Sequence, residues 1–206
     1  MNGAVKHISI NIPTRTYLKK FIHYKLGETF FSDGPHHIQK YITALLAKKS
    51  VYNYNFTALN NQYKDRLTIF LSKSAYIHAG FSMKQEHVQD FNNYVEFLFD
   101  EDLVKFCHDY VKFHNVAKDA VKLFAEQYNI KIGERQARSL FRTEPLIQDA
   151  RAAFAKKLGL VIEEDITDEA LKKMEYRART RKNKAENIFS QPVPQVSKSK
   201  VLFLFQ

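Results

Sequence analysis

The chain has 206 residues, of which 45% are apolar, and a formal charge of +10. A positive charge of this size favours a polyanionic partner, most often nucleic acid and sometimes an anionic membrane, although a basic protein can also lack such a partner. Cys107 is the single cysteine, which excludes an internal disulfide, and no run of about 18 apolar residues could span a membrane. Since no signal peptide is recognisable, we expect a cytoplasmic protein.

The first fifty residues predict one strand followed by two helices. Three isoleucines alternate with polar residues between 7 and 12, which is the period of two of a half-buried strand. A helix is then predicted from Thr14, its N-cap, to Gly27, its C-terminal stop. After a turn at 32–35, apolar residues recur every three or four positions up to Leu46, which predicts the second helix.

The next fifty residues repeat this order. Residues 51–65 predict a loop or a short edge strand, and Leu67, Ile69 and Leu71 then alternate like the isoleucines. A short helix follows, and Ser82 with Gln85 forms a capping box that opens a longer one. We interpret the two halves as an internal duplication of a strand–helix–helix unit, although two unrelated pieces would give the same pattern.

From Asp100 onward the pattern is helical, and the acids at 100–102 suit the start of a helix. We therefore expect a predominantly helical α+β protein: a small antiparallel ribbon with duplicated strand–helix–helix units, then a helical C-terminal half. The expected divisions are 1–99, 100–189 with a basic last helix, and 190–206, which combines a flexible linker with an apolar tail.

The outer faces of the two predicted strands are polar, and this layout resembles the ribbon-helix-helix DNA-binding family. That family forms dimers whose strands pair into an antiparallel ribbon in the major groove. The duplication suggests that both ribbon strands come from one chain here. The resemblance implies that base contacts come from His7, Ser9, Asn11, Arg66 and Thr68. Phe70 departs from the pattern because it carries no donor or acceptor. The alternative is an ordinary α+β core with solvated outer faces.

A second stretch, "VKLFAEQYNIKIGERQARSLFR", resembles a helix-turn-helix. Its second helix would present Arg135 and Arg138 to the groove. The apolar positions of that helix come two residues later than the pattern requires, at Ala137 and Leu140. Two helices of a bundle are the alternative interpretation.

The last predicted helix is the most basic part of the chain. Its apolar stripe is narrow, and the rest of its surface is suited to neutralising phosphates, unless it is simply solvated. Its stretch "KKMEYRARTRKNK" contains one acid, Glu175, against Lys172, Lys173, Arg177, Arg179, Arg181, Lys182 and Lys184.

The sequence ends in "VLFLF", which resembles the clamp-binding peptide of bacterial replication proteins through Leu202, Leu204 and Phe205. Val201 stands where that peptide has glutamine. An exposed apolar tip on a linker suggests a protein partner, whereas a last strand folded back on the domain is the alternative.

Several pieces, among them "YLKKFIHYKLG", "FNNYVEFLF" and "DEALKKMEYRAR", are similar to uncharacterised DNA-binding-type proteins of Bacteroidetes phages and mobile elements. No phosphate-binding loop, dinucleotide fingerprint or zinc-ligand spacing is present, so the sequence supports no enzyme, and we expect no cofactor and no metal. A DNA-processing enzyme without these motifs is a further alternative. The sequence favours a protein that binds double-stranded DNA, as a transcriptional regulator or accessory factor of a phage or mobile element. The alternative is a non-enzymatic adaptor or virion component that docks through its C-terminal tail.

Overall fold

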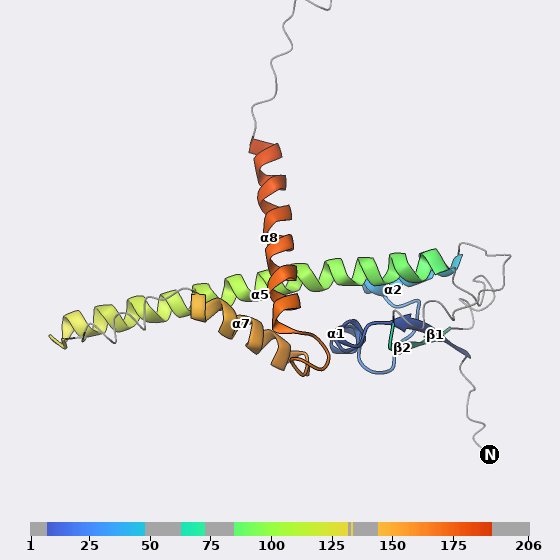
Figure 1. Cartoon of the computed structure of the whole chain (residues 1–206), viewed down its shortest axis with the longest axis horizontal. Helices are drawn as coiled ribbons and strands as arrows, with labels where there is room; N and C mark the ends of the chain where they lie inside the picture. The colour runs from blue at the N-terminus through green and yellow to red at the C-terminus, as the bar shows by residue number, and fades with distance from the viewer. Residues whose placement is uncertain (1–7, 48–62, 73–84, 132, 134–143, 191–206) are drawn as a thin grey trace, which may run out of the picture.

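The computed structural model describes residues 8–47, 63–72, 85–131, 133 and 144–190. Its elements are two strands, β1 (Ile8–Thr14) and β2 (Asp65–Leu71), and five helices: α1 (Thr16–Leu26), α2 (His37–Ala47), α5 (Gln85–Gln127), α7 (Glu144–Lys157) and α8 (Asp168–Ser190). The long helix α5 is the axis of the molecule, with the sheet and α1 beside one end and α8 crossing its middle (Figure 1). The predominantly helical α+β class is confirmed.

The two strands pair antiparallel, as predicted, and their alternation decides which face is buried. Ile12 lies opposite Leu67 and Ile10 opposite Ile69, and Ile12, Leu67 and Ile69 are buried in the core. The second edge of β2 is occupied as well, because the segment around Phe31 exchanges backbone hydrogen bonds with Phe70 at 2.9 and 3.1 Å. Residues 73–84, on which the predicted duplication depends, lie outside the described residues.

The start of α1 differs from the prediction. Arg15 occupies the N-cap position and its side chain makes no capping hydrogen bond, whereas Thr14 is fully buried and donates its hydroxyl hydrogen to Asn92 Oδ1 at 2.8 Å. Asn92 in turn donates to the carbonyls of Pro13 and Val88, both at 2.9 Å. Thr14 is therefore a tertiary contact between β1 and α5 rather than a cap. At the other end, Gly27 stops α1 as predicted, with φ +85°.

One hydrophobic core runs through both predicted halves of the chain. The expected boundary at 99/100 falls inside α5, and the helix start predicted at Asp100 is wrong. No glycine or proline interrupts this stretch, and its apolar stripe continues from Val95 to Leu103. The ring of Phe99 meets Tyr17 at 5.2 Å and Phe154 at 5.4 Å between ring centroids, so α1, α5 and α7 share this one core.

None of the helices within the described ranges is both long and apolar enough to cross a membrane.

Candidate nucleic-acid interface

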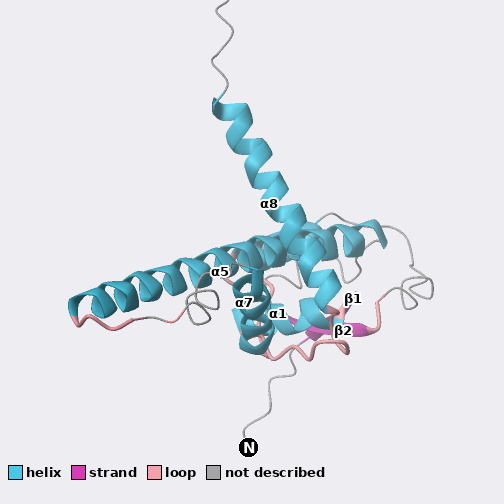
Figure 2. Ribbon diagram, turned by 60° about the vertical axis from the view of Figure 1, so that its left-hand side comes forward, coloured by secondary structure: helices cyan, strands magenta, loops and turns pink. Residues whose placement is uncertain are grey.

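The basic helix α8 packs on the body through the apolar stripe that the sequence predicted. Leu171, Met174 and Ala178 are buried, and α8 crosses α5 at a steep angle (Figures 1 and 2). Beyond the crossing, the C-terminal turns of α8 extend away from the sheet in both views. The helix is thus packed on α5 near its start, and its later turns point away from the sheet toward Ser190 (Figure 1).

Two of the predicted phosphate-binding arginines form ion pairs with acids of α5. Arg181 Nη2 lies 3.1 Å from Asp100 Oδ2, and Arg177 Nη2 lies 3.0 Å from Glu96 Oε1 and 3.7 Å from Asp100 Oδ2. The guanidinium of Arg181 also lies 4.9 Å from the centroid of the Phe97 ring. These arginines hold α8 on α5, and their predicted role as phosphate contacts stays a prediction.

Arg179 is engaged on the other flank of α8. It pairs with Glu175 one turn earlier, and Glu175 also accepts a hydrogen bond from Arg151 of α7 at 3.3 Å. Arg151 and Glu175 are both buried. Arg179 therefore belongs to a network that joins α7 and α8, and only part of its charge is available to a ligand.

Asp100 is the least usual group at this crossing. It is 1% exposed, and among the described residues its Oδ1 has no hydrogen-bond partner. Burial raises the pKa of Asp100 to about 6, although Arg177 and Arg181 act in the opposite direction. Folding thus keeps a carboxylate in a place where burial disfavours its charge, and two arginines compensate only partly.

The side of α8 that faces away from the core keeps its lysines accessible. Lys172, Lys173, Tyr176 and Lys184 are exposed there, and they share one side because they follow the helical repeat. Lys173 has an exposed ion pair with Glu169 at 3.1 Å. Within the parts of the chain that the structure describes, Lys172 and Lys184 make no ion pair. We call these four residues the outer face of α8.

Lys182 has a different position. It lines a cavity of about 640 Å³ between α5, α7 and α8, whose lining also includes the polar Glu101, His108 and Arg179 and the less polar Cys107 and Ile147. Cys107 is buried and its pKa is raised to about 11 by that burial, as expected for a core thiol. Among the described residues no three His, Cys, Asp or Glu side chains gather to hold a metal ion.

The polar face of the ribbon exists as predicted. Ser9, Asn11, Arg66 and Thr68 are all exposed, and the register sets Asn11 opposite Thr68. The Thr68 hydroxyl donates to Asn11 Oδ1 at 2.8 Å, so these two polar side chains partly satisfy each other.

The structure does not bring the ribbon face and α8 together. The sheet lies on one side of α5 and the free end of α8 extends on the other, in both views (Figures 1 and 2). The remaining predicted residues, His7, Arg135, Arg138, Leu202, Leu204 and Phe205, lie outside the described residues.

The acids of α5 that engage α8 were missed by sequence reasoning. Glu96 and Asp100 are about one helical turn apart, a spacing common on solvated helix faces. Only the crossing of the two helices, which periodicity does not reveal, identifies them as partners of Arg177 and Arg181.

Comparison with protein-family models, with curated proteins and with solved structures gives no match.

Proposed function

We propose that this protein binds double-stranded DNA through the outer face of α8, as a transcriptional regulator or accessory factor. The observation that supports this most is the division of the basic residues of α8 into two groups. Arg177 and Arg181 are paired with α5, whereas Lys172 and Lys184 remain exposed on the outer face. The first group holds the helix and the second is available to phosphates.

A helix held in this way offers its charges at fixed distances. Lys172 and Lys184 are separated by about 18 Å along the helix axis, which is wider than the major groove of about 12 Å. Lysines at this separation can contact phosphates on both sides of a groove and release condensed counterions. Such contacts supply affinity, and they do not by themselves select a sequence.

Regulation of particular promoters would need base contacts as well, and the ribbon face is the candidate. Asn11 can bond an adenine edge and Arg66 a guanine edge in the major groove. Because the ribbon and the free end of α8 lie on opposite sides of α5 (Figure 2), a straight duplex held on the outer face of α8 would not reach the ribbon. Base reading by the ribbon is therefore a separate contact, to be tested separately.

The experiment is a salt titration of duplex binding. Replacing Lys172, Lys173 and Lys184 by alanine should weaken binding to all sequences alike and reduce the slope of log K against log [salt] by about 1 for each lysine that contacts a phosphate. Lys40→Ala on α2, an exposed lysine far from α8 in sequence, is the control. It removes a positive charge elsewhere and should leave the slope unchanged.

Two results would contradict the proposal. One is that wild-type protein fails to bind duplex DNA at low salt. The other is that the triple variant and Lys40→Ala change the slope equally per charge removed, which would indicate only a general effect of net charge. Random-duplex selection with Asn11→Ala and Arg66→Ala then tests the ribbon, since only a base contact alters the selected sequence.

A further inference from the structure

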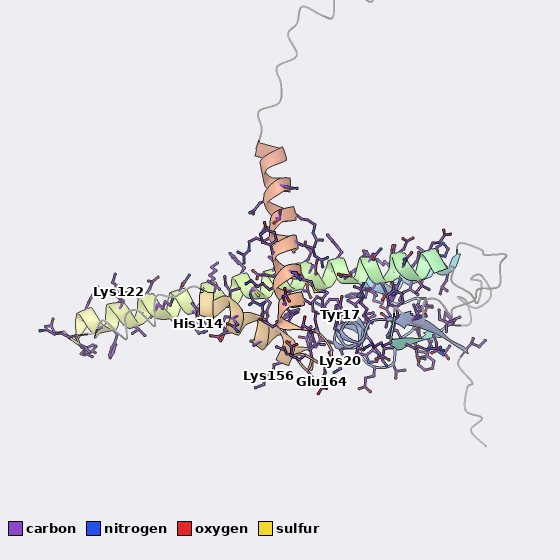
Figure 3. All side chains as sticks on the ribbon, viewed as in Figure 1. Tyr17, Lys20, His114, Lys122, Lys156 and Glu164 are labelled. Carbon is purple, nitrogen blue, oxygen red and sulfur yellow. The ribbon has the colours of Figure 1, made fainter. Side chains whose placement is uncertain are left out.

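The C-terminal part of α5 presents an exposed apolar face. Its members fall on one side of a helical wheel: Phe113, Ala117, Ala120, Val121, Phe124 and Tyr128. Tyr128 continues the helical repeat, because its N–H still bonds to the Phe124 carbonyl at 3.1 Å. All of them are exposed, and Phe113, Phe124 and Tyr128 are 73%, 56% and 60% accessible. We call residues 113–128 the arm, and Figure 3 shows His114 and Lys122 on it.

Nearer the sheet, the same side of α5 is covered by another helix. The ring of Phe154 in α7 lies 5.4 Å from Phe99 and 5.5 Å from Phe106, centroid to centroid. The arm extends past α7 and α8 in both views (Figures 1 and 2). This side of α5 thus packs against a helix where it is covered, whereas along the arm its rings are accessible.

No lysine or acid lies on the exposed face. At 100° per residue, the charged side chains of the arm all fall about 100° or more from the centre of the face; they are Lys118, Asp119, Lys122 and Glu126. An apolar centre from which charges are excluded is typical of the core of a protein interface. A face of this kind marks a contact with another molecule.

The spacing of the face is symmetric about a point between Ala120 and Val121. Phe113 and Tyr128 are equally far from this point along the sequence, and so are Ala117 and Phe124. An identical arm laid antiparallel, with the two midpoints level, therefore brings Phe113 level with Tyr128 of the second copy. It also brings Ala117 level with Phe124 of the second copy, so a large ring meets a small side chain, as interdigitated helices require.

We propose that two copies of this chain associate through their arms, as antiparallel helices related by a two-fold axis at the midpoint between Ala120 and Val121. Such a contact is self-complementary and closed, so association stops at two copies. The symmetric spacing is what favours a second copy as the occupant, because a partner of another sequence would not require it.

The exposed area is sufficient for a dimer of moderate affinity. The accessible parts of the three aromatic rings, Phe113, Phe124 and Tyr128, amount to about 400 Å² in each copy. With the flanking side chains, a pair of copies would bury on the order of 1,000 Å², at the low end of specific interfaces. We therefore expect a dissociation constant on the order of micromolar.

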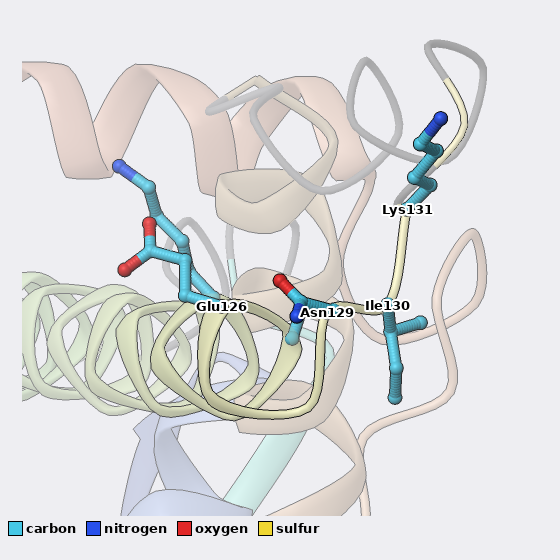
Figure 4. Close-up of a pocket in the computed structure, with 6 residues that line it drawn as sticks. Glu126, Asn129, Ile130 and Lys131 are labelled. Carbon is cyan, nitrogen blue, oxygen red and sulfur yellow. The ribbon is translucent and has the colours of Figure 1, made fainter.

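The antiparallel arrangement also keeps the rest of the two copies apart. It sets Tyr110 of the second copy level with Lys131, which lies beyond the end of α5. There Asn129 has a left-handed φ of +54°, and the Ile130 N–H bonds to the Ala125 carbonyl at 2.8 Å. This helix end turns the chain out of the helix axis, as Figure 4 shows. The arm thus ends where the more covered part of the second α5 begins.

Charge opposes this contact only weakly. The side chains of Lys118 in the two copies lie at one rim, about 7.5 Å apart along the helix axes, where water screens their repulsion. The charge of +10 on each copy adds a longer-range repulsion that salt reduces. Dimerisation should therefore become stronger between about 50 and about 500 mM NaCl, whereas binding to DNA should become weaker.

Analytical ultracentrifugation of the full-length chain tests the proposal, at concentrations from about 1 to about 200 μM that span the expected dissociation constant. Phe124→Glu, at the centre of the face, should raise this constant by about 10-fold or more. The matched control is Leu123→Glu, which introduces the same charge at a neighbouring residue that is 65% exposed. Leu123 falls about 120° from the centre of the face, so the control should change the constant by less than about threefold.

Two results of this experiment would overturn the proposal. One is a chain that stays monomeric at the highest concentration in about 500 mM NaCl, where charge repulsion is screened. The other is a dimer that both substitutions weaken equally, or that neither weakens, which would place the contact elsewhere on the molecule.

Cysteine cross-linking tests the antiparallel register. Ala120→Cys sets two thiols beside the two-fold axis, about 1.5 Å apart along the helix axes, and should give a disulfide-linked dimer under mild oxidation. Ala117→Cys is the matched control, because its two copies lie about 10 Å apart along the axes, beyond the reach of a disulfide of about 7 Å between Cα atoms. It should cross-link at least several-fold less, and equal cross-linking would overturn the antiparallel arrangement. The buried Cys107, whose pKa is about 11, should stay reduced.

Discussion

Arg181 of α8 and Asp100 of α5 lie 3.1 Å apart although 81 positions separate them in the sequence. Asp100 is buried and offers this bond through Oδ2 alone, while Arg181 reaches it from a half-exposed position beside Phe97. The contact explains how the strongly basic helix α8 can pack against the rest of the protein. Acidic side chains of α5 compensate part of its positive charge.

The first prediction concerns pH and Asp100→Asn. The pKa of Asp100 is raised in the folded state, so the folded protein binds this proton more readily than the unfolded chain does. Protonated Asp100 therefore adds to the free energy of unfolding at low pH, and this stabilisation is lost as the pH rises from about 4 through 6. Asparagine imitates the protonated form, so the variant should gain up to about 3 kcal/mol over wild type between pH 4 and pH 7.5.

The measurement is urea unfolding of both proteins across that range. The lowered pKa values of His23 and His36 give a slope of opposite sign, but they are present in both proteins and cancel in the difference. The measured quantity is the free energy of unfolding of Asp100→Asn minus that of wild type. If this difference is constant with pH, or shrinks as the pH rises, the burial argument for Asp100 is contradicted.

The second prediction concerns Arg181→Ala. Removing this guanidinium leaves the buried carboxylate with Arg177 alone at 3.7 Å, and should cost about 1–3 kcal/mol at pH 7.5. In the Asp100→Asn background the same change should cost clearly less, because no buried charge is left behind. A double-mutant cycle, measured by chemical unfolding, gives the interaction free energy between Arg181 and Asp100. Equal costs in both backgrounds would show that Arg181 acts through its packing on Phe97.

The third prediction separates the capping role of Thr14 from its tertiary role. Thr14→Val removes the hydroxyl that Asn92 accepts and should cost about 1–2 kcal/mol. Thr14→Ser keeps the hydroxyl and should lose less. Far-UV circular dichroism of the folded protein should be unchanged in both, since the hydroxyl bonds to α5 and not to α1. A loss of helix signal in Thr14→Val alone would restore the capping interpretation.

The fourth prediction compares two glycines. A Cβ at Gly27 or at Gly159 would touch nothing within 4 Å, so any cost of alanine comes from the backbone. Gly27 combines φ +85° with ψ 167°, a region that is essentially restricted to glycine, and Gly27→Ala should cost about 1–3 kcal/mol. Gly159, at φ +66°, lies close to the ordinary left-handed region, and Gly159→Ala should cost about 1 kcal/mol. Thermal unfolding measures both, and the reverse order would contradict the argument.

Local patterns predicted the elements, and tertiary contacts account for the errors. The alternation at Ile10 and Ile12 identified both the strand and its buried face, and Gly27 marked the end of α1. Thr14 and Asp100 suited helix starts by local rules, but each is used by a partner about 80 positions away in sequence, Asn92 or Arg181. Local propensity carries no information on such partners.

The candidate site was predicted in composition but not in arrangement. The basic residues of α8 were identified from their number, and the apolar stripe through Leu171 and Ala178 was confirmed. Which of the basic residues face solvent depends on where α8 crosses α5. Arg177 and Lys173 carry the same charge, yet Arg177 bonds to the half-buried Glu96 of α5, whereas Lys173 pairs with the exposed Glu169 of its own helix.

The position of Phe99 has a consequence for any attempt to divide the protein. Its ring touches Tyr17 and Phe21 on one side and Phe154 on the other, so the strand-bearing part of the chain completes its core with a helix encoded more than forty residues later. An N-terminal fragment cut after residue 99 would lack that helix. Transplanting or recombining the ribbon, in the laboratory or in evolution, therefore requires residues 144–157 to move with it.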